Sequence, residues 1–149
     1  MVGLAAGSRH ACAWSAAGAL WCWGANTTGE VGDGTTEARL TPTRVALAGP
    51  CVAAAGGEGF TCAALADGRV QCWGVGAEGQ LGDGARVARM APSEVVGLPP
   101  VDALAAGLAH TCARTREGEV WCWGRGFAGQ LGQGIEAERE APVRVVGLE

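Results

Sequence analysis

The chain has 149 residues, of which 26 are Gly and 48% are hydrophobic, a composition that excludes a disordered chain and indicates a fold rich in turns. Its 11 basic residues, all Arg, against 15 acidic residues give a net charge of −4 without a basic stripe, so nucleic-acid binding is not expected. No apolar run approaches the roughly 18 residues that span a bilayer, so membrane insertion is not expected. No signal peptide is recognisable, so an exported protein is expected to carry its leader outside this chain.

The chain repeats itself at a fixed step of fifty residues. Segments with the pattern Cys-Ala…Gly…Cys-Trp-Gly begin at Cys12, Cys62 and Cys112 and align without a gap. A period of this size is typical of an array of similar units that share their cores with their neighbours. The predicted units of this one continuous domain are residues 1–50, 51–100 and 101–149.

The first unit reads as four short strands separated by Gly-containing turns. The expected strands begin near Val2, His10, Leu20 and Pro42. No segment keeps an apolar period of about 3.6 residues over about ten residues, so helices are not expected. Four short strands per unit are typical of a propeller blade. The predicted fold class is therefore all-β, with three tandem four-stranded propeller blades.

The second and third strands of each unit are expected to form a hairpin whose register follows from the position of its turn. With the turn centred on Ala17, Cys12 lies opposite Cys22, while Trp21 and Trp23 lie opposite alanines. Because strand side chains alternate between faces, the cysteines share one face of the sheet and the two tryptophans share the other. Buried Trp is expected to supply much of the apolar area between blades.

Six of the seven cysteines fall into three opposed pairs. Directly opposed residues have Cβ atoms about 4.5–5.5 Å apart, and a disulfide needs roughly 3.5–4.5 Å, so a modest adjustment permits a bond. The predicted disulfides are Cys12–Cys22, Cys62–Cys72 and Cys112–Cys122. They indicate an extracellular or cell-surface location, whereas cytoplasmic, reduced cysteines packed as small hydrophobic residues are the alternative. Cys51 is expected to fill the core, with an intermolecular bridge as its alternative.

A metal site is weighed and not predicted. His10, Cys12 and Cys22 share a strand face, and the same trio recurs around His110, but Phe60 breaks the pattern and no fourth ligand is apparent. The histidines are interpreted as packing residues that hydrogen-bond to the backbone. No unique cluster of acid, base and nucleophile is present, so neither enzymatic activity nor a cofactor is expected.

The third unit carries several motifs in a fixed order. The segments are Ala109-His110-Thr111-Cys112-Ala113, Glu117-Gly118-Glu119-Val120-Trp121-Cys122-Trp123-Gly124, Gly129-Gln130-Leu131-Gly132-Gln133-Gly134 and Pro142-Val143-Arg144-Val145. Together they resemble the regulator of chromosome condensation repeat family, and the resemblance covers essentially the whole chain. It implies a β-propeller, usually of seven blades, so three blades are expected to form an open arc with two raw edges. The remaining blades of a longer protein, or further copies of the chain, are expected to close the ring.

Members of this family have varied roles, including nucleotide exchange on small GTPases, ultraviolet sensing, protein inhibition and bacterial surface roles, so the resemblance does not settle the function. The sequence favours a non-catalytic binding module, part of an exported bacterial-type propeller, that recognises another protein or a glycan through its loops. The alternatives are an intracellular regulator resembling the guanine-nucleotide exchange factors of small GTPases, and a purely structural propeller segment.

The repeats differ most in the Gly-rich stretches that follow the third strand of each unit. The candidate binding residues there are Asn26, Thr28, Glu37, Arg39, Glu78, Arg86, Arg89, Arg125, Phe127, Glu136, Glu138 and Glu140. Arg39 and Arg89 recur with Arg139, and this recurrence favours pairing with a nearby acid over contact with a ligand. The acidic run at 136–140 favours a solvated loop, with a basic partner as the alternative.

Overall fold

The computed structural model describes residues 1–148 as three four-stranded antiparallel sheets, with no helix in this part of the chain. Blade 1 consists of β1 (Gly3–Ala6), β2 (His10–Trp14), β3 (Leu20–Gly24) and β4 (Arg39–Val45). Blade 2 consists of β5 (Cys51–Gly56), β6 (Phe60–Leu65), β7 (Val70–Gly74) and β8 (Arg89–Glu94). Blade 3 consists of β9 (Val101–Ala106), β10 (His110–Thr115), β11 (Val120–Gly124) and β12 (Arg139–Arg144). The predicted fold class is confirmed.

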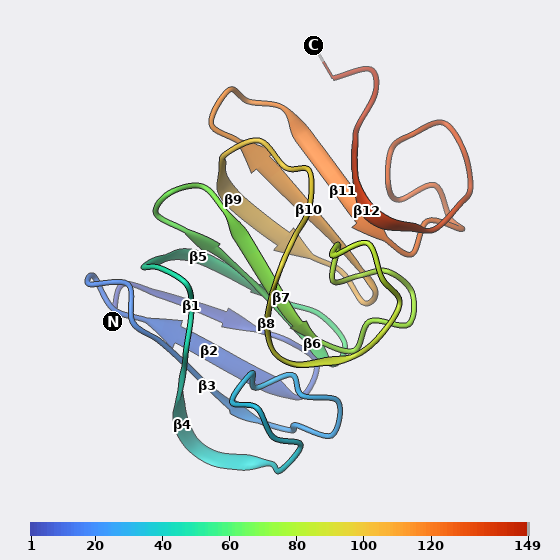
Figure 1. The fold of residues 1–149 in the computed structure, drawn as a ribbon. Coiled ribbons are helices and arrows are strands. Elements are labelled where there is room, and N and C mark those ends of the chain that lie inside the picture. The colour runs from blue at the N-terminus through green and yellow to red at the C-terminus, as the bar shows by residue number, and fades with distance from the viewer. Residues whose placement is uncertain (149) are drawn as a thin grey trace.

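The blades follow one another in an open arc, with blade 2 in the middle (Figure 1). In each blade the strands pair in chain order, so the first strand is innermost and the fourth outermost. The inner strand β5 contacts both β1 and β9. Within residues 1–148, no helix has the length and apolar character needed to cross a membrane.

The central hairpins have the register that the sequence predicts. Cys12 pairs with Cys22, and Trp21 and Trp23 pair with alanines. The paired cysteine Cα atoms are 4.1 Å apart, as in the closer type of antiparallel pair. The same geometry recurs in blades 2 and 3, with S–S distances of 2.11 and 2.12 Å. The three predicted cysteine pairs therefore lie at disulfide distance.

Cys51 is the free cysteine of the described chain, and it lies buried at the start of β5. Only 3% of the residue is exposed, and it packs in the core between blades 1 and 2. Burial raises the pKa of its thiol to about 11, only partly offset by a hydrogen bond with the carbonyl of Ala53. A protonated, buried thiol suits the predicted role as core filler better than an intermolecular bridge.

Neighbouring blades join through unlike faces. The disulfide face of blade 1 packs against Trp73 of blade 2, and the disulfide face of blade 2 packs against Trp123 of blade 3. Both tryptophans are fully buried, and their indole Nε1 atoms donate to the carbonyls of Glu30 (2.9 Å) and Gln80 (3.0 Å) in the preceding blade. Each junction therefore combines apolar burial with a hydrogen bond that only a ring N–H at this point can make.

Glycine is required where the loop of one blade meets the tryptophan of the next. Gly32 has φ +83°, and a Cβ there would lie 2.5 Å from Nε1 of Trp73. Gly82 has φ +65°, and a Cβ there would lie 2.7 Å from Nε1 of Trp123. The recurring Gly thus serves both the backbone turn and the close approach of the ring.

The histidine at the first junction differs from the expectation. Nε2 of His10 lies 2.7 Å from the Thr61 hydroxyl of the next blade, rather than bonding to backbone. The Thr61 hydroxyl in turn donates to the Glu30 carbonyl at 2.8 Å. The sequence could not identify this partner, because Thr61 meets His10 only through the packing of one blade on another.

Candidate functional site

The connections between strands emerge on two opposite sides of the blades (Figure 1). We call one side the loop face. It carries the short turns after the first strand of each blade, at residues 7–9, 57–59 and 107–109, and the long loops after the third strand, at 25–38, 75–88 and 125–138. The hairpin turns between the second and third strands lie on the other side, which we call the turn face.

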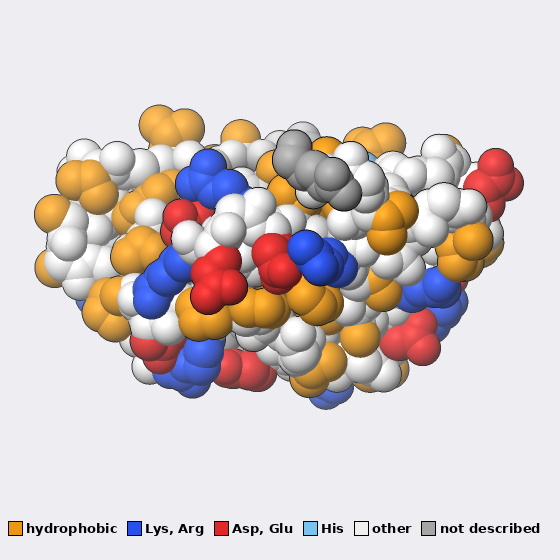
Figure 2. Space-filling model, turned by 90° about the horizontal axis from the view of Figure 1, so that it is seen from above, with side chains coloured by type: hydrophobic (Ala, Val, Ile, Leu, Met, Phe, Trp, Pro, Cys, Tyr) orange, Lys and Arg blue, Asp and Glu red, His pale blue; other side chains and the backbone are white. Residues whose placement is uncertain are grey.

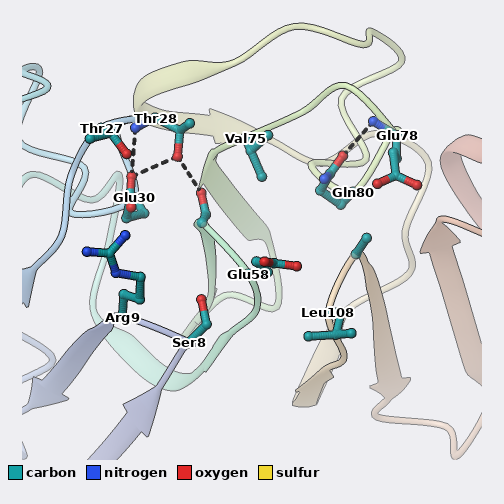
Figure 3. A pocket seen from close by; sticks show the side chains of 12 residues that line it. Ser8, Arg9, Thr27, Thr28, Glu30, Glu58, Val75, Glu78, Gln80 and Leu108 are labelled. Atoms are coloured by element: carbon teal, nitrogen blue, oxygen red, sulfur yellow. Dashed lines mark hydrogen bonds between the residues drawn. The ribbon is translucent and has the colours of Figure 1, made fainter.

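The loop face contains a pocket of about 380 Å³ at the junction of all three blades (Figure 3). A volume of this size lies within the range of ligand-binding pockets, about 300–1,000 Å³. The lining residues are Ser8, Arg9, Thr27, Thr28, Glu30, Glu58, Gly59, Val75, Glu78, Gln80, Leu108 and Ala109. They come from the short turns of all three blades and from the long loops of blades 1 and 2.

The pocket is lined by equivalent positions that carry different residues in the three repeats. Ser8, Glu58 and Leu108 occupy the same place in their turns but are a hydroxyl, a carboxylate and an aliphatic side chain. Thr28 and Glu78 likewise occupy one equivalent position in the long loops. The blade scaffold therefore repeats, while the chemistry of the pocket does not.

Acidic side chains outnumber basic ones around the pocket. Arg9 and Glu58 are exposed, and neither makes an ion pair within residues 1–148. Glu78 is bridged by Arg125 from blade 3 at 3.3 Å. The carboxylate of Glu30 accepts hydrogen bonds from both the N–H and the hydroxyl of Thr28 and shapes the rim rather than facing a ligand. Glu58 is thus the carboxylate with its charge most available, at the centre of the pocket (Figure 3).

The structure divides the predicted loop residues into several groups. Thr28 and Glu78 line the pocket, and Arg125 borders it through its contact with Glu78. Asn26 is fully buried, and its amide donates to the carbonyls of Thr35 (3.0 Å) and Glu37 (2.9 Å). Its side chain holds the loop from inside, so we leave Asn26 out of the proposed contact surface.

Two of the recurring arginines brace their own loops. Arg39 pairs with Asp33, and Arg89 pairs with Asp83 at 3.0 Å. Burial opposes ionisation of Asp33, but hydrogen bonds from Thr35 and Arg39 outweigh it and hold the pKa of this carboxyl below its usual value. The equivalent Arg139 meets no such acid, since its unit carries Gln at that point, and it donates to the carbonyl of Glu138 instead.

The acidic run of the third loop is joined to blade 2. Arg86 contacts both Glu138 and Glu140, the latter at 3.2 Å. One Arg therefore offsets half of the charge of these two carboxylates and ties the acidic run to blade 2. Glu136 and Phe127 are exposed on the outer part of this loop, with 57% of Phe127 accessible, and Glu37 is exposed on the loop of blade 1.

Ser8, Arg9, Glu58 and Leu108 are pocket residues that the sequence did not identify. They lie in the short turns after the first strand of each blade, outside the long stretches in which the repeats differ visibly. The sequence does hold a signal for these residues. The turn has the same length in all three units, but positions 8, 58 and 108 carry unlike side chains. Within residues 1–148, no group of three or more His, Cys, Asp or Glu residues is arranged to hold a metal ion.

Two family models match the chain, both described as the regulator of chromosome condensation (RCC1) repeat. One matches residues 2–30, 51–80 and 101–130, and the other matches residues 17–64, 67–114 and 117–149. The second frame begins inside one blade and ends inside the next, so it follows the junction between blades rather than the single sheet. No curated protein sequence matches the chain.

Several solved structures have a similar fold. Prp20p from Saccharomyces cerevisiae, described with its binding properties to Gsp1p and histones, is 25% identical with a TM-score of 0.88, and the match covers 97% of this chain and 38% of Prp20p. Human WBSCR16 is 24% identical with a TM-score of 0.85, over 97% of this chain and 37% of that protein. The ectodomain of the Physcomitrella patens receptor kinase CR4 is 25% identical with a TM-score of 0.54, over 89% of this chain and 31% of that ectodomain. The chain therefore spans less than two fifths of each of these proteins.

Proposed function

The chain belongs to the regulator of chromosome condensation repeat family, and on this premise we propose that it is a non-catalytic module that binds another protein through its loop face. The pocket at the junction of the three blades is the observation that carries the proposal. It gathers side chains from positions where the repeats differ, and a repeat protein places its specificity at such positions. We propose a protein rather than a glycan, since Prp20p is described as binding the proteins Gsp1p and histones.

We further propose that the partner inserts a basic side chain into this pocket. Glu58 is exposed at its centre without an ion pair among the described residues, and Glu78 stands on the rim. A pocket of about 380 Å³ accommodates a long side chain such as Arg, and the guanidinium group binds carboxylates in a bidentate geometry.

A titration with two labelled peptides tests this proposal. The probe is a peptide of alternating Arg and Gly, and its control is a peptide of the same length with Glu in place of Arg. We expect the Arg peptide to bind and the charge reversal Glu58→Arg to weaken it at least about fivefold, because loss of an exposed charge pair costs up to about 1 kcal/mol and the new Arg also repels the peptide. The measurement is fluorescence anisotropy at moderate ionic strength.

Glu117→Arg is the matched control, since Glu117 is exposed on the turn face and the substitution changes the net charge equally. We expect this variant to bind the Arg peptide as the unmodified chain does. Equal weakening by both variants would mean that the peptide responds to net charge alone, and no binding of the Arg peptide would remove the proposal of a basic partner.

We also propose that the protein acts outside the cytosol. Three cysteine pairs at disulfide distance support export, because disulfides persist in oxidising compartments. The similar fold in the ectodomain of CR4 is a second support. Alkylation and intact mass analysis of protein kept from reductants is expected to find one free thiol, that of Cys51, whereas seven free thiols would contradict the export proposal.

The second candidate function is regulation of a small GTPase by nucleotide exchange. The description of Prp20p with Gsp1p favours it, although the present chain spans 38% of that protein. The two candidates differ in a direct assay, since an exchange factor accelerates release of labelled nucleotide from a small GTPase. Accelerated release together with reduced cysteines would support this candidate and contradict the exported module.

A further inference from the structure

Within the chain, the disulfide face of one blade packs twice against the Trp face of the next blade. The two outer faces of the arc are one face of each of these two kinds. In blade 2, which has a neighbour on each side, every residue of β6 and β7 is buried. In blade 1 the disulfide face is covered and the Trp face is half-exposed. In blade 3 Trp123 is buried, and on the disulfide face Cys112 is half-exposed while Cys122 is buried. Each end thus shows the face that its own internal junction does not use.

The outer face of blade 1 presents groups that are buried at the two internal junctions. Trp23 occupies the position of Trp73 and Trp123, yet it is half-exposed and its indole N–H has no hydrogen-bond partner within residues 1–148. Leu4 is 79% exposed, whereas its equivalent Leu104 packs against the core between blades 2 and 3. We call this surface the Trp edge.

The outer face of blade 3 presents the complementary groups. At the internal junctions Gly34 donates its N–H to the carbonyl of Met90, and Gly84 donates to that of Glu140, each at 2.9 Å. The equivalent N–H of Gly134 has no backbone partner in the described chain, and Leu40, which stands at the position of Met90 and Glu140, is 93% exposed on blade 1. We call this surface the loop edge.

The third long loop also has open space where the first two long loops meet the following blade. A Cβ on Gly29 or on Gly79 would lie 2.7 Å from a Cα of the following blade, whereas nothing lies within 4 Å of a Cβ on Gly129. On the sheet of blade 3, an apolar hollow of about 200 Å³ is lined by Ala105, Cys112 and Val120 among others. Figure 2 looks onto the blade 3 end of the molecule and shows a row of hydrophobic side chains below a group of charged ones in the middle of the view.

We propose that the loop edge of one copy of this chain binds the Trp edge of a second copy, head to tail. In this contact the indole of Trp23 donates to the carbonyl of Gln130, as Trp123 donates to Gln80 within the chain. Leu4 covers apolar surface of blade 3, and the N–H of Gly134 reaches the carbonyl of Leu40. Each of these groups has its counterpart in a junction that the same chain already forms.

One pair at this junction departs from the internal pattern. At the internal junctions the Trp face carries a Thr, Thr61 or Thr111. The equivalent residue on the Trp edge is Ala11, so it offers no hydroxyl to His110 of the other copy. The junction of blades 2 and 3 also lacks a His–Thr bond, since Phe60 occupies the histidine position. The contact is therefore expected to tolerate this difference.

The proposed contact joins two unlike surfaces. When one copy binds another, the pair still has one free Trp edge and one free loop edge, until a ring closes. With three blades in each copy, two copies supply six, and propellers close with about four to eight blades. A closed dimer is thus the smallest ring that this contact allows.

Sedimentation velocity over a wide range of protein concentration tests the proposal. We expect the oxidised chain to associate reversibly. Gly129→Asn adds a side chain where the next blade approaches, and Asn tolerates positive φ, so this variant is expected to remain a monomer. Gly97→Asn is its matched control, because Gly97 also has positive φ (+70°), lies between β8 and β9 outside both edges, and has nothing within 4 Å of the place where a Cβ would stand. This control is expected to associate normally.

Mixing two blocked variants separates a head-to-tail contact from any other. Leu4→Arg blocks the Trp edge, and we expect it to be a monomer alone but to form a dimer with Gly129→Asn, since each variant keeps the edge that the other lacks. Circular dichroism confirms that both variants keep the fold. A monomer at all concentrations for the unmodified chain, association that both variants retain, or a mixture that stays monomeric would each overturn the proposal.

Discussion

His10 couples the packing of blades 1 and 2 to pH. The Thr61 hydroxyl donates its proton to the Glu30 carbonyl, so it can only accept from His10, which fixes the proton of the neutral ring on Nε2. Nδ1 is buried and has no hydrogen-bond partner in the described part of the chain. Protonation would place a second donor there without an acceptor, and burial accordingly lowers the pKa of His10, partly offset by the charge of Glu30.

A lowered histidine pKa makes the fold less stable in acid. The unfolded chain takes up the proton near pH 6.5 while the folded chain resists it, so the contribution of His10 is complete above that pH and is lost as the pH falls below it. We predict that His10→Phe, which copies Phe60 of blade 2, lessens the fall in stability between about pH 7.5 and about pH 5.5. Urea unfolding at the two pH values measures the difference.

Some pH dependence is expected to remain in His10→Phe, because burial also lowers the pKa of His110. The double variant that also carries His110→Phe is the control, and its stability should vary least over this range. A single variant that loses as much stability in acid as the unmodified chain would show that His10 is not the coupled group.

At the scale of the strand and loop, the blade junction depends on glycine for two separable reasons. Gly82 and Gly84 both have positive φ, +65° and +82°, but only Gly82 faces the ring of Trp123. Gly84 has nothing within 4 Å of the place where a Cβ would stand. The two positions therefore separate the cost of backbone strain from the cost of a side chain inside the junction.

We predict that Gly84→Ala lowers the free energy of unfolding by about 1 kcal/mol through backbone strain alone. Gly82→Ala is expected to cost about 2–4 kcal/mol, because the added methyl group also displaces the buried indole. Equilibrium urea unfolding of the two variants gives both values. Equal losses would contradict the account of the junction.

The elements that the sequence predicts correctly are those that a single repeat determines. The exact period and the turn at Ala17 specify the register of Cys12 and Cys22 because both strands of the hairpin lie in one unit. The start of β4 at Arg39, rather than near Pro42, escapes prediction because Arg39 pairs with Gly24 across a register shift after Cys22, which the repeat pattern does not reveal.

Contacts between blades were beyond reach of the sequence for a different reason. His10 meets Thr61, and Arg86 meets Glu138 and Glu140, across junctions that join residues about fifty positions apart. A periodic pattern shows that units stack, but it does not show which face of one meets which face of the next. The pocket around Glu58 depends on the same stacking, and for this reason the candidate loop residues included only part of its lining.

At the scale of the whole molecule, the arc has two kinds of surface with different proposed roles. The Trp edge and the loop edge expose groups whose equivalents are buried between blades. The loop face carries side chains that differ between the repeats. The two proposals are separable, because Leu4 and Gly129 lie outside the pocket lining. A chain that fails to associate can still bind a basic peptide, and the reverse also holds.

Amide chemical-shift mapping with the Arg peptide shows where a basic partner binds on the chain. Binding at the loop-face pocket is expected to shift the amides of Ser8, Arg9, Glu58 and Leu108 most, with little change at the hairpin turns 15–19, 65–69 and 115–119 of the turn face. Shifts centred on the turn face or spread evenly over the surface, or no shifts at all, would mean that the pocket does not bind a basic partner.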